Sequence, residues 1–287
     1  MQPPSTSARA ASMKRKTVEL EEGWRFMAAC LAKIRRAVDG DGERLSGEEH
    51  MLAYATVYDM CNQREPHKYS QQLYQRYKDD LESYIASTVL PPLKEMHGET
   101  LLRELLERWT KHNRVVSHGN MLFCYLNRYY VPSRSLPPVD ELGPAAFRRL
   151  VLKELKSTMT GAMIAMIDDE REGKLIDRDL VKNDLDIFIP VGLGHLDDYQ
   201  VDFEQAFLEG TRDYYSGKAQ TWILEYSDSD YMLKVEECLQ NEKERVAHFL
   251  DSSIEPKLME AVRSELITKV PRIADGNLKK NSEEGAT

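Results

Sequence analysis

Apolar side chains recur at intervals of three and four residues along almost the whole chain from Thr17 onward. This is the period of an amphipathic α-helix, and the alternating β-branched runs that indicate strands are nearly absent. The pattern predicts an all-α protein of about ten helices, which with short loops would pack as an antiparallel bundle or a solenoid. The first segment shows the spacing with Trp24, Met27, Leu31 and Ile34.

Glycines, prolines and capping residues indicate where helices begin and end. Gly40 and Gly42 end the first segment, and Ser46 followed by two glutamates is typical of a helix N-cap. The pair Pro91-Pro92 is expected to end or kink the segment before it. The other apolar segments cover 54–61, 69–90, 102–109, 121–131, 147–155, 159–167, 177–191, 203–224, 231–250 and a last helix that starts at Pro256.

The distribution of charged and apolar residues argues against two classes of protein. The 287 residues carry 39 Lys and Arg against 48 Asp and Glu, a net charge of −9. Nucleic-acid-binding proteins need a basic field, so nucleic acid is not an expected partner. No run approaches the roughly 18 consecutive apolar residues of a membrane span, so no membrane association is expected.

Cysteines and histidines show no metal-binding spacing. No Cys-x-x-Cys pair occurs, and none of the seven histidines is followed by another four residues later. We therefore expect no metal site, no cofactor, and reduced, buried thiols in a protein of the cytoplasm and nucleus. The four cysteines are Cys30, Cys61, Cys124 and Cys238.

The domain organisation follows from changes in composition. Residues 1–16 lack periodicity and large apolar groups and are predicted to be a disordered tail, and residues 271–287 a frayed polar tail. The proline-containing loop 136–138 lies near the midpoint. It divides the helical part into two five-helix units, 17–138 and 139–270.

Two acidic clusters allow an enzyme interpretation. Asp168-Asp169-Glu170-Arg171-Glu172 and the group Asp197-Asp198 with Asp202 could hold Mg²⁺ against a diphosphate, as in helical isoprenoid synthases. An acidic helix end before Gly173 explains the first cluster more simply. Gly192-Leu193-Gly194 lacks the third glycine of a dinucleotide-binding loop and is expected to be a turn. A Mg²⁺-dependent helical enzyme therefore stays a minor alternative, and no catalytic residues are assigned.

Two aromatic stripes favour a protein-binding function. Tyrosine is enriched at the centres of protein interfaces, although a stripe at helical spacing can equally belong to a core. The residues alone leave open which side of each helix faces solvent. The first stripe comprises Tyr54, Val57, Tyr58 and Cys61, preceded by His50 and Met51. The second comprises Leu122, Tyr125, Leu126, Tyr129 and Tyr130, with Asn127 and Arg128 on the polar side.

Several long strings resemble the N-terminal region of a cullin, most closely the plant members that scaffold SCF ubiquitin ligases. The first of them reads Tyr-Ala-Thr-Val-Tyr-Asp-Met-Cys over 54–61. The resemblance covers about residues 17 to 270. The remaining strings lie at 66–74, 102–109, 125–130, 134–138, 167–173, 213–216, 231–238 and 244–248.

The resemblance implies an elongated stalk of two five-helix cullin repeats, 17–138 and 139–270. It further implies a non-catalytic scaffold of an SCF-type cullin–RING ubiquitin ligase. In this family two helices of the first repeat bind a Skp-type adaptor that carries an F-box protein. By motif position these are the helices that bear the two stripes, and the implied adaptor-binding residues are His50, Met51, Tyr54, Val57, Tyr58, Leu122, Tyr125, Leu126, Asn127 and Tyr130. We expect them to be adjacent and antiparallel, so that the stripes form one apolar patch.

The matched region leaves out the family's third repeat and its C-terminal domain, which binds the RING protein. No RING protein is therefore expected on this chain, and competitive inhibition of SCF assembly becomes a hypothesis. The alternative is a diverged helical interaction module with another partner.

Two positions depart from the family pattern. Family members often have tyrosine where this chain has His50, and we expect the change to weaken adaptor binding by about 1 kcal/mol. The segment 117–120 replaces a more basic, Trp-containing segment, and Gly119 is expected to loosen the start of the following helix by roughly 0.5–1 kcal/mol.

Overall fold

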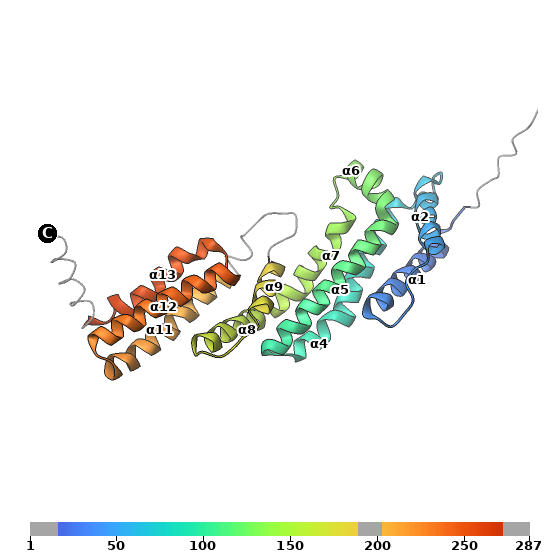
Figure 1. Cartoon of the computed structure of the whole chain (residues 1–287). Helices are drawn as coiled ribbons and strands as arrows, with labels where there is room; N and C mark the ends of the chain where they lie inside the picture. The colour runs from blue at the N-terminus through green and yellow to red at the C-terminus, as the bar shows by residue number, and fades with distance from the viewer. Residues whose placement is uncertain (1–16, 189–202, 272–287) are drawn as a thin grey trace, which may run out of the picture. The chain divides into compact units, whose positions relative to one another are not determined.

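The computed structural model describes residues 17–188 and 203–271 (Figure 1). Within these ranges every regular element is helical, which confirms the all-α prediction. None of the described helices is long and apolar enough to cross a membrane. The elements are α1 (Leu20–Asp39), α2 (Gly47–Asn62), α3 (Ser70–Tyr84), η1 (Ile85–Val89), α4 (Leu90–Glu95), α5 (Gly98–Tyr125), η2 (Leu126–Tyr130), α6 (Val131–Arg134), α7 (Val139–Phe147), η3 (Arg148–Leu152), α8 (Lys153–Arg171), α9 (Arg178–Phe188), α11 (Gln205–Glu225), α12 (Asp228–Phe249), η5 (Ser252–Ile254), α13 (Glu255–Arg263) and η6 (Ser264–Thr268).

The described residues form two compact units. Unit 1 comprises 17–81 and 111–143, and unit 2 comprises 82–110, 144–188 and 203–271. Because α5 contributes its first half to unit 2 and its second half to unit 1, the units are interleaved along the chain. Consecutive repeats with a boundary at 138 therefore stay a prediction. The tail 1–16, the turn at 192–194 and nearly all of the C-terminal tail lie outside the described residues.

The first helix boundaries are the predicted ones. Gly40 follows α1 in a left-handed conformation, with φ 89°, which glycine adopts without strain. Ser46 caps α2: its hydroxyl accepts from the Glu49 N–H at 3.1 Å, and the Glu49 carboxylate accepts from the Ser46 N–H at 2.7 Å. This reciprocal capping box fixes where α2 begins.

The proline pair 91–92 does not end its helix. The helical path continues from α3 through the π-helical turn η1 into α4. In that turn the Leu90 N–H donates to the Ile85 carbonyl, five residues back. The Arg108 guanidinium donates at 3.1 Å to the Thr88 carbonyl, the group that an N–H at position 92 would otherwise bond. The prediction that the helix ends at the proline pair is therefore wrong. The helix instead contains a π-helical turn just before the prolines.

The segment 117–120 is not a helix start. It lies inside α5, and Gly119 is buried there. A Cβ atom at position 119 would lie 2.2 Å from the Tyr77 hydroxyl oxygen, so only glycine lets this fully buried ring approach. The Tyr77 ring in turn lies 4.5 Å from that of Phe123. The expectation that Gly119 loosens a helix start is therefore wrong, because the residue permits close packing.

The thiols are only partly as expected. Cys30 and Cys61 are buried, and burial raises the pKa of Cys61 to about 11. Cys238 is half-buried, and Cys124 is exposed on α5. The prediction of four buried thiols is wrong for Cys124, because the apolar face of α5 at this point is formed by Leu122 and Phe123.

The interior of unit 2 contains a network of ion pairs. The Arg171 Nε lies 2.8 Å from Glu242 Oε1, and Arg245 Nη1 lies 2.8 Å from the same oxygen. The Tyr215 hydroxyl donates to this oxygen at 2.6 Å. Burial opposes ionisation of Glu242, but Arg171 and Arg245 outweigh it and lower the pKa of this carboxyl. The network joins α8, α11 and α12.

Candidate functional site

The two predicted stripes lie side by side in unit 1. The rings of His50 and His118 are 6.4 Å apart, and those of Tyr58 and Tyr125 are 5.2 Å apart in an edge-to-face contact. Residue numbers rise in the same direction along both helices, so α2 and α5 are parallel and the antiparallel expectation is wrong. The reason is that the chain reverses twice between them, once before α3 and once before α5.

Three of the predicted residues are exposed apolar side chains on α2. Met51 is 75% exposed, Tyr54 41% and Tyr58 37%. The structure adds three exposed residues to the predicted adaptor-binding set, of which only the third belongs to a predicted stripe: Leu52 on α2, Met121 on α5 and Tyr129 on η2. Met121 and Tyr129 lie four residues before and after Tyr125, a signal that helical spacing already contained. We call the six exposed residues the aromatic patch: Met51, Leu52, Tyr54, Tyr58, Met121 and Tyr129.

Three other predicted residues are buried beneath the aromatic patch. Val57, Leu122 and Leu126 are at most 1% exposed and belong to the core of unit 1. They offer no side-chain surface to a partner while the unit is folded. This revises the expectation of direct contact, because their packing holds the helices on which the patch residues lie.

Asn127 and Tyr130 organise the connection to α7. The Asn127 side-chain oxygen accepts from the Val139 N–H at 2.6 Å, which caps α7, and its amide donates to Asn120 at 2.7 Å. The half-buried Tyr130 ring lies 6.1 Å from that of Tyr74. Both residues therefore have internal partners that account for their presence.

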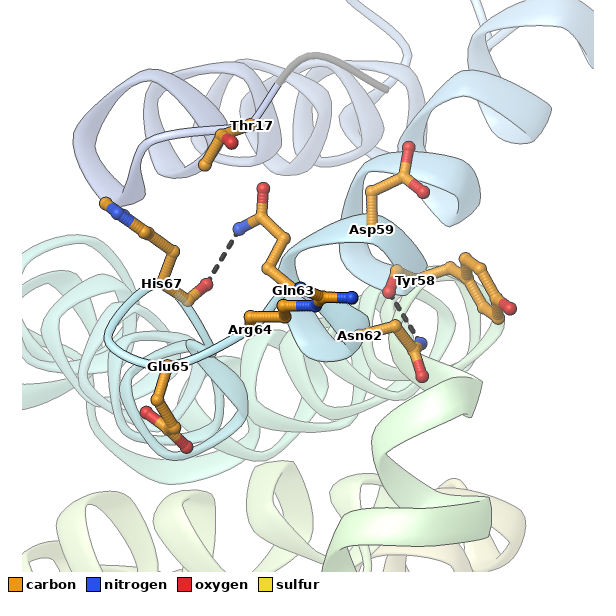
Figure 2. A pocket seen from close by; sticks show the side chains of 8 residues that line it. All are labelled: Thr17, Tyr58, Asp59, Asn62, Gln63, Arg64, Glu65 and His67. Carbon is orange, nitrogen blue, oxygen red and sulfur yellow. Dashed lines mark hydrogen bonds between the residues drawn. The ribbon is translucent and has the colours of Figure 1, made fainter. Parts of the chain in front are cut away.

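Tyr125 connects the patch to a polar edge. Its hydroxyl donates to the Asn62 side-chain oxygen at 2.7 Å, and its ring lies 4.7 Å from that of Tyr129. Beside Asn62 a cavity of about 480 Å³ opens at the end of α2 (Figure 2). Polar and charged residues such as Asn62 and Arg64 line it, and the Gln63 side chain donates to the His67 carbonyl at 2.7 Å. The apolar patch thus has a polar neighbour, as at the rim of a protein interface.

Two polar side chains near the aromatic patch have defined contacts. The Arg128 guanidinium lies 5.5 Å from the centre of the Tyr129 ring. The imidazole of the half-buried His50 makes a 3.1 Å hydrogen bond through Nδ1 to the Ser46 carbonyl, which orients the ring at the start of α2. A partner would therefore meet an apolar centre with a basic group at one side.

The first acidic cluster is occupied by cations of the chain itself. Asp168 pairs with Arg171 at 2.8 Å, Asp169 with Lys174 at 2.7 Å, Glu170 with Arg245 at 2.8 Å and Glu172 with Lys218 at 2.7 Å. The second cluster, at 197–202, lies outside the described residues. Within the described ranges no three acidic, histidine or cysteine side chains are arranged to hold a metal ion. The magnesium interpretation has no support from the first cluster.

Comparison with known proteins identifies the family. The family model for the cullin alpha solenoid domain matches residues 24–278. The chain is 52% identical to Cullin-1 of Oryza sativa subsp. japonica over 90% of its own length and 35% of that protein. It is 44% identical to Putative cullin-like protein 2 of Arabidopsis thaliana, covering 68% of it, and 39% identical to Cullin-like protein 3 of the same plant, covering 94% of it.

The coverage differs between these relatives. The chain spans about a third of the length of the Oryza Cullin-1. Because the family model matches most of this chain, and because the relatives are similar over nearly all of it, the chain belongs to the cullin family.

Proposed function

We propose that the chain is a non-catalytic scaffold that binds a Skp-type adaptor, with its F-box protein, through the aromatic patch. The observation that carries this proposal is the pairing of α2 with the second half of α5. It places exposed tyrosines and methionines from two separate segments on one unit. Exposed apolar groups gathered in this way mark interaction sites more often than scattered ones do.

The choice of partner rests on the family. Cullins are scaffold proteins of ubiquitin ligases, and the Oryza relative named Cullin-1 is 52% identical to this chain. The aromatic patch lies on the two helices that, by motif position, correspond to the adaptor-binding helices of the SCF class. The proposed place of action is the cytoplasm and nucleus, where SCF ligases work.

A polypeptide of these 287 residues would also compete with a longer cullin for the same adaptor, because both would present the same two helices. Adding the chain to a reconstituted SCF ligase should therefore slow ubiquitination of an F-box substrate. If the ligase keeps its full rate at a tenfold excess of the chain, the chain does not compete.

The direct test is calorimetric titration with a purified adaptor–F-box pair. We expect nanomolar affinity, about −12 kcal/mol. Tyr54→Ala and Tyr58→Ala should each weaken binding at least about tenfold, because tyrosines that a partner covers on binding are typical hot spots of interfaces. Leu233→Ala, an exposed apolar residue of unit 2, is the matched control and should leave the affinity unchanged.

Two results would contradict the proposal. One is no binding at tens of micromolar by a chain whose circular dichroism is helical, which would favour a diverged module with another partner. The other is tight binding that survives both tyrosine substitutions, which would place the adaptor elsewhere on the chain.

A further inference from the structure

A second cavity of unit 1 lies outside the aromatic patch. It has a volume of about 460 Å³ and is formed by α1, by the connection that follows it, and by the facing sides of α2 and α5. Sites for small molecules usually have about 300–1,000 Å³. The cavity is therefore large enough for a small organic ligand.

One wall of this cavity is apolar. Ile34 and Val38 lie one turn apart on α1, and Leu45 follows in the connection to α2. Ile34 and Leu45 belong to the core of unit 1, and Val38 packs against it. The wall is therefore fixed by the same packing that holds the helices together, and it would accept a hydrocarbon or aromatic group.

The lining also contains two basic side chains. Arg44 and Arg114 both border the cavity and are exposed. Neither lies within ion-pair distance of a carboxylate among the residues that the structure describes. Basic residues of α1, by contrast, have carboxylate partners. Lys33 pairs with Glu49 at 2.8 Å, and Arg35 pairs with Asp80. In a chain of net charge −9, two uncompensated guanidinium groups beside one cavity are a specific feature.

Two imidazoles complete the lining. His50 and His118 border the cavity, with ring centres 6.4 Å apart. The Nδ1 atom of His118 is buried, and no group in the described part of the chain bonds it. A buried polar atom of this kind is normally satisfied by a protein group, a water or a ligand.

We propose that this cavity binds a small amphipathic anion, with an apolar body against Ile34, Val38 and Leu45 and a carboxylate or phosphate head toward Arg44 and Arg114. A guanidinium group binds either head through two parallel N–H···O bonds. Neither arginine belongs to the aromatic patch, so substituting them tests this site separately from adaptor binding, although His50 borders both.

The test measures binding of simple probes to the full chain by calorimetry. Octanoate and octyl phosphate carry both parts of the ligand, whereas acetate and octanol each carry one. At least one of the two complete probes should bind with a submillimolar Kd, and acetate and octanol at least tenfold more weakly. The better of the two complete probes identifies the head group.

Variants decide whether the proposed residues are responsible. Arg44→Gln and Arg114→Gln should each weaken binding of the better probe at least fivefold. Arg212→Gln removes an exposed arginine of α11 in unit 2 and should change nothing. Absence of binding by both complete probes at 10 mM overturns the proposal. So does binding that Arg44→Gln and Arg114→Gln leave unchanged, or that octanol reproduces.

Discussion

The two units of this cullin-family chain place polar and apolar groups differently. In unit 1 the large exposed apolar residues gather on α2, α5 and η2, while its buried polar residues are only Ser70 and His112 among those described. Unit 2 has scattered exposed leucines, and it buries ionised groups such as Glu242 and Arg245 in its interior.

This difference suggests a division of labour. Apolar groups on a surface cost solubility unless a partner covers them, whereas buried ion pairs cannot reach a partner. We infer that unit 1 binds the partner protein. The buried ion pairs of unit 2 keep the helices of unit 2 in a fixed arrangement. Each of the substitutions below lies in one unit and should leave the other unaffected.

The largest effect is expected from breaking the buried network of unit 2. Glu242→Leu leaves Arg171 and Arg245 without their shared carboxylate, which should destabilise unit 2 by about 3–5 kcal/mol. Urea unfolding followed by the fluorescence of Trp109 and Trp222, in a Trp24→Phe background, reports unit 2.

The control for this experiment is Glu236→Leu, which changes an exposed glutamate of the same helix and should shift stability by less than about 0.5 kcal/mol. Adaptor affinity should survive Glu242→Leu at temperatures where unit 2 stays folded. Equal stability of the two variants would show that the network does not hold unit 2.

The second effect is an opposite response of the two units to pH. Burial raises the pKa of Asp184, in unit 2, from its usual 3.8 to about 8. Between these values the folded state binds more protons than the unfolded state, so unit 2 loses stability as the pH rises, by up to about 4 kcal/mol from pH 4 to pH 7.

Burial lowers the pKa of His112, in unit 1, from 6.5 to about 4. There the unfolded state binds more protons, so unit 1 loses about 3 kcal/mol as the pH falls from 6.5 to 4.

Denaturant unfolding at several pH values tests both signs. Asp184→Asn should flatten the dependence of unit 2 between pH 4 and 7 without altering unit 1, and His112→Gln should do the converse. The comparison fails if both units respond to pH with the same sign, or if Asp184→Asn leaves the pH slope of unit 2 intact.

A third, intermediate effect concerns helical glycines. Gly119→Ala places a Cβ atom against the Tyr77 hydroxyl and should destabilise unit 1 by about 1–3 kcal/mol. Gly161→Ala, in α8 of unit 2, meets nothing within 4 Å and should stabilise that unit by roughly 0.5–1 kcal/mol. Thermal unfolding of both variants measures these changes, and a shift of the same sign in both would contradict the close packing at Gly119.

The same glycine shows what sequence reasoning can and cannot reach. The capping box at Ser46 and the stop at Gly40 were predictable because their partners lie within a few residues. The packing role of Gly119 was not, because it depends on Tyr77, which lies against Gly119 from another helix. For the same reason the helical period identified both stripes but could not separate the buried Val57 from the exposed Tyr58 beside it.

The smallest effect is expected at the edge of the aromatic patch. His50→Tyr restores the aromatic residue that many family members carry and should strengthen adaptor binding by about 1 kcal/mol, close to fivefold. His97→Tyr changes an exposed histidine of unit 2 and serves as the control. Unchanged calorimetric affinity for His50→Tyr would mean that this position lies outside the interface.

Hydrogen–deuterium exchange of the whole chain, with and without the adaptor–F-box pair, tests the division of labour most directly. The account predicts that the partner slows exchange in α2 and in the region from the second half of α5 to η2, and leaves α11 and α12 unchanged. Protection confined to α11 and α12, with α2 exchanging as in the free chain, would contradict the assignment of recognition to unit 1.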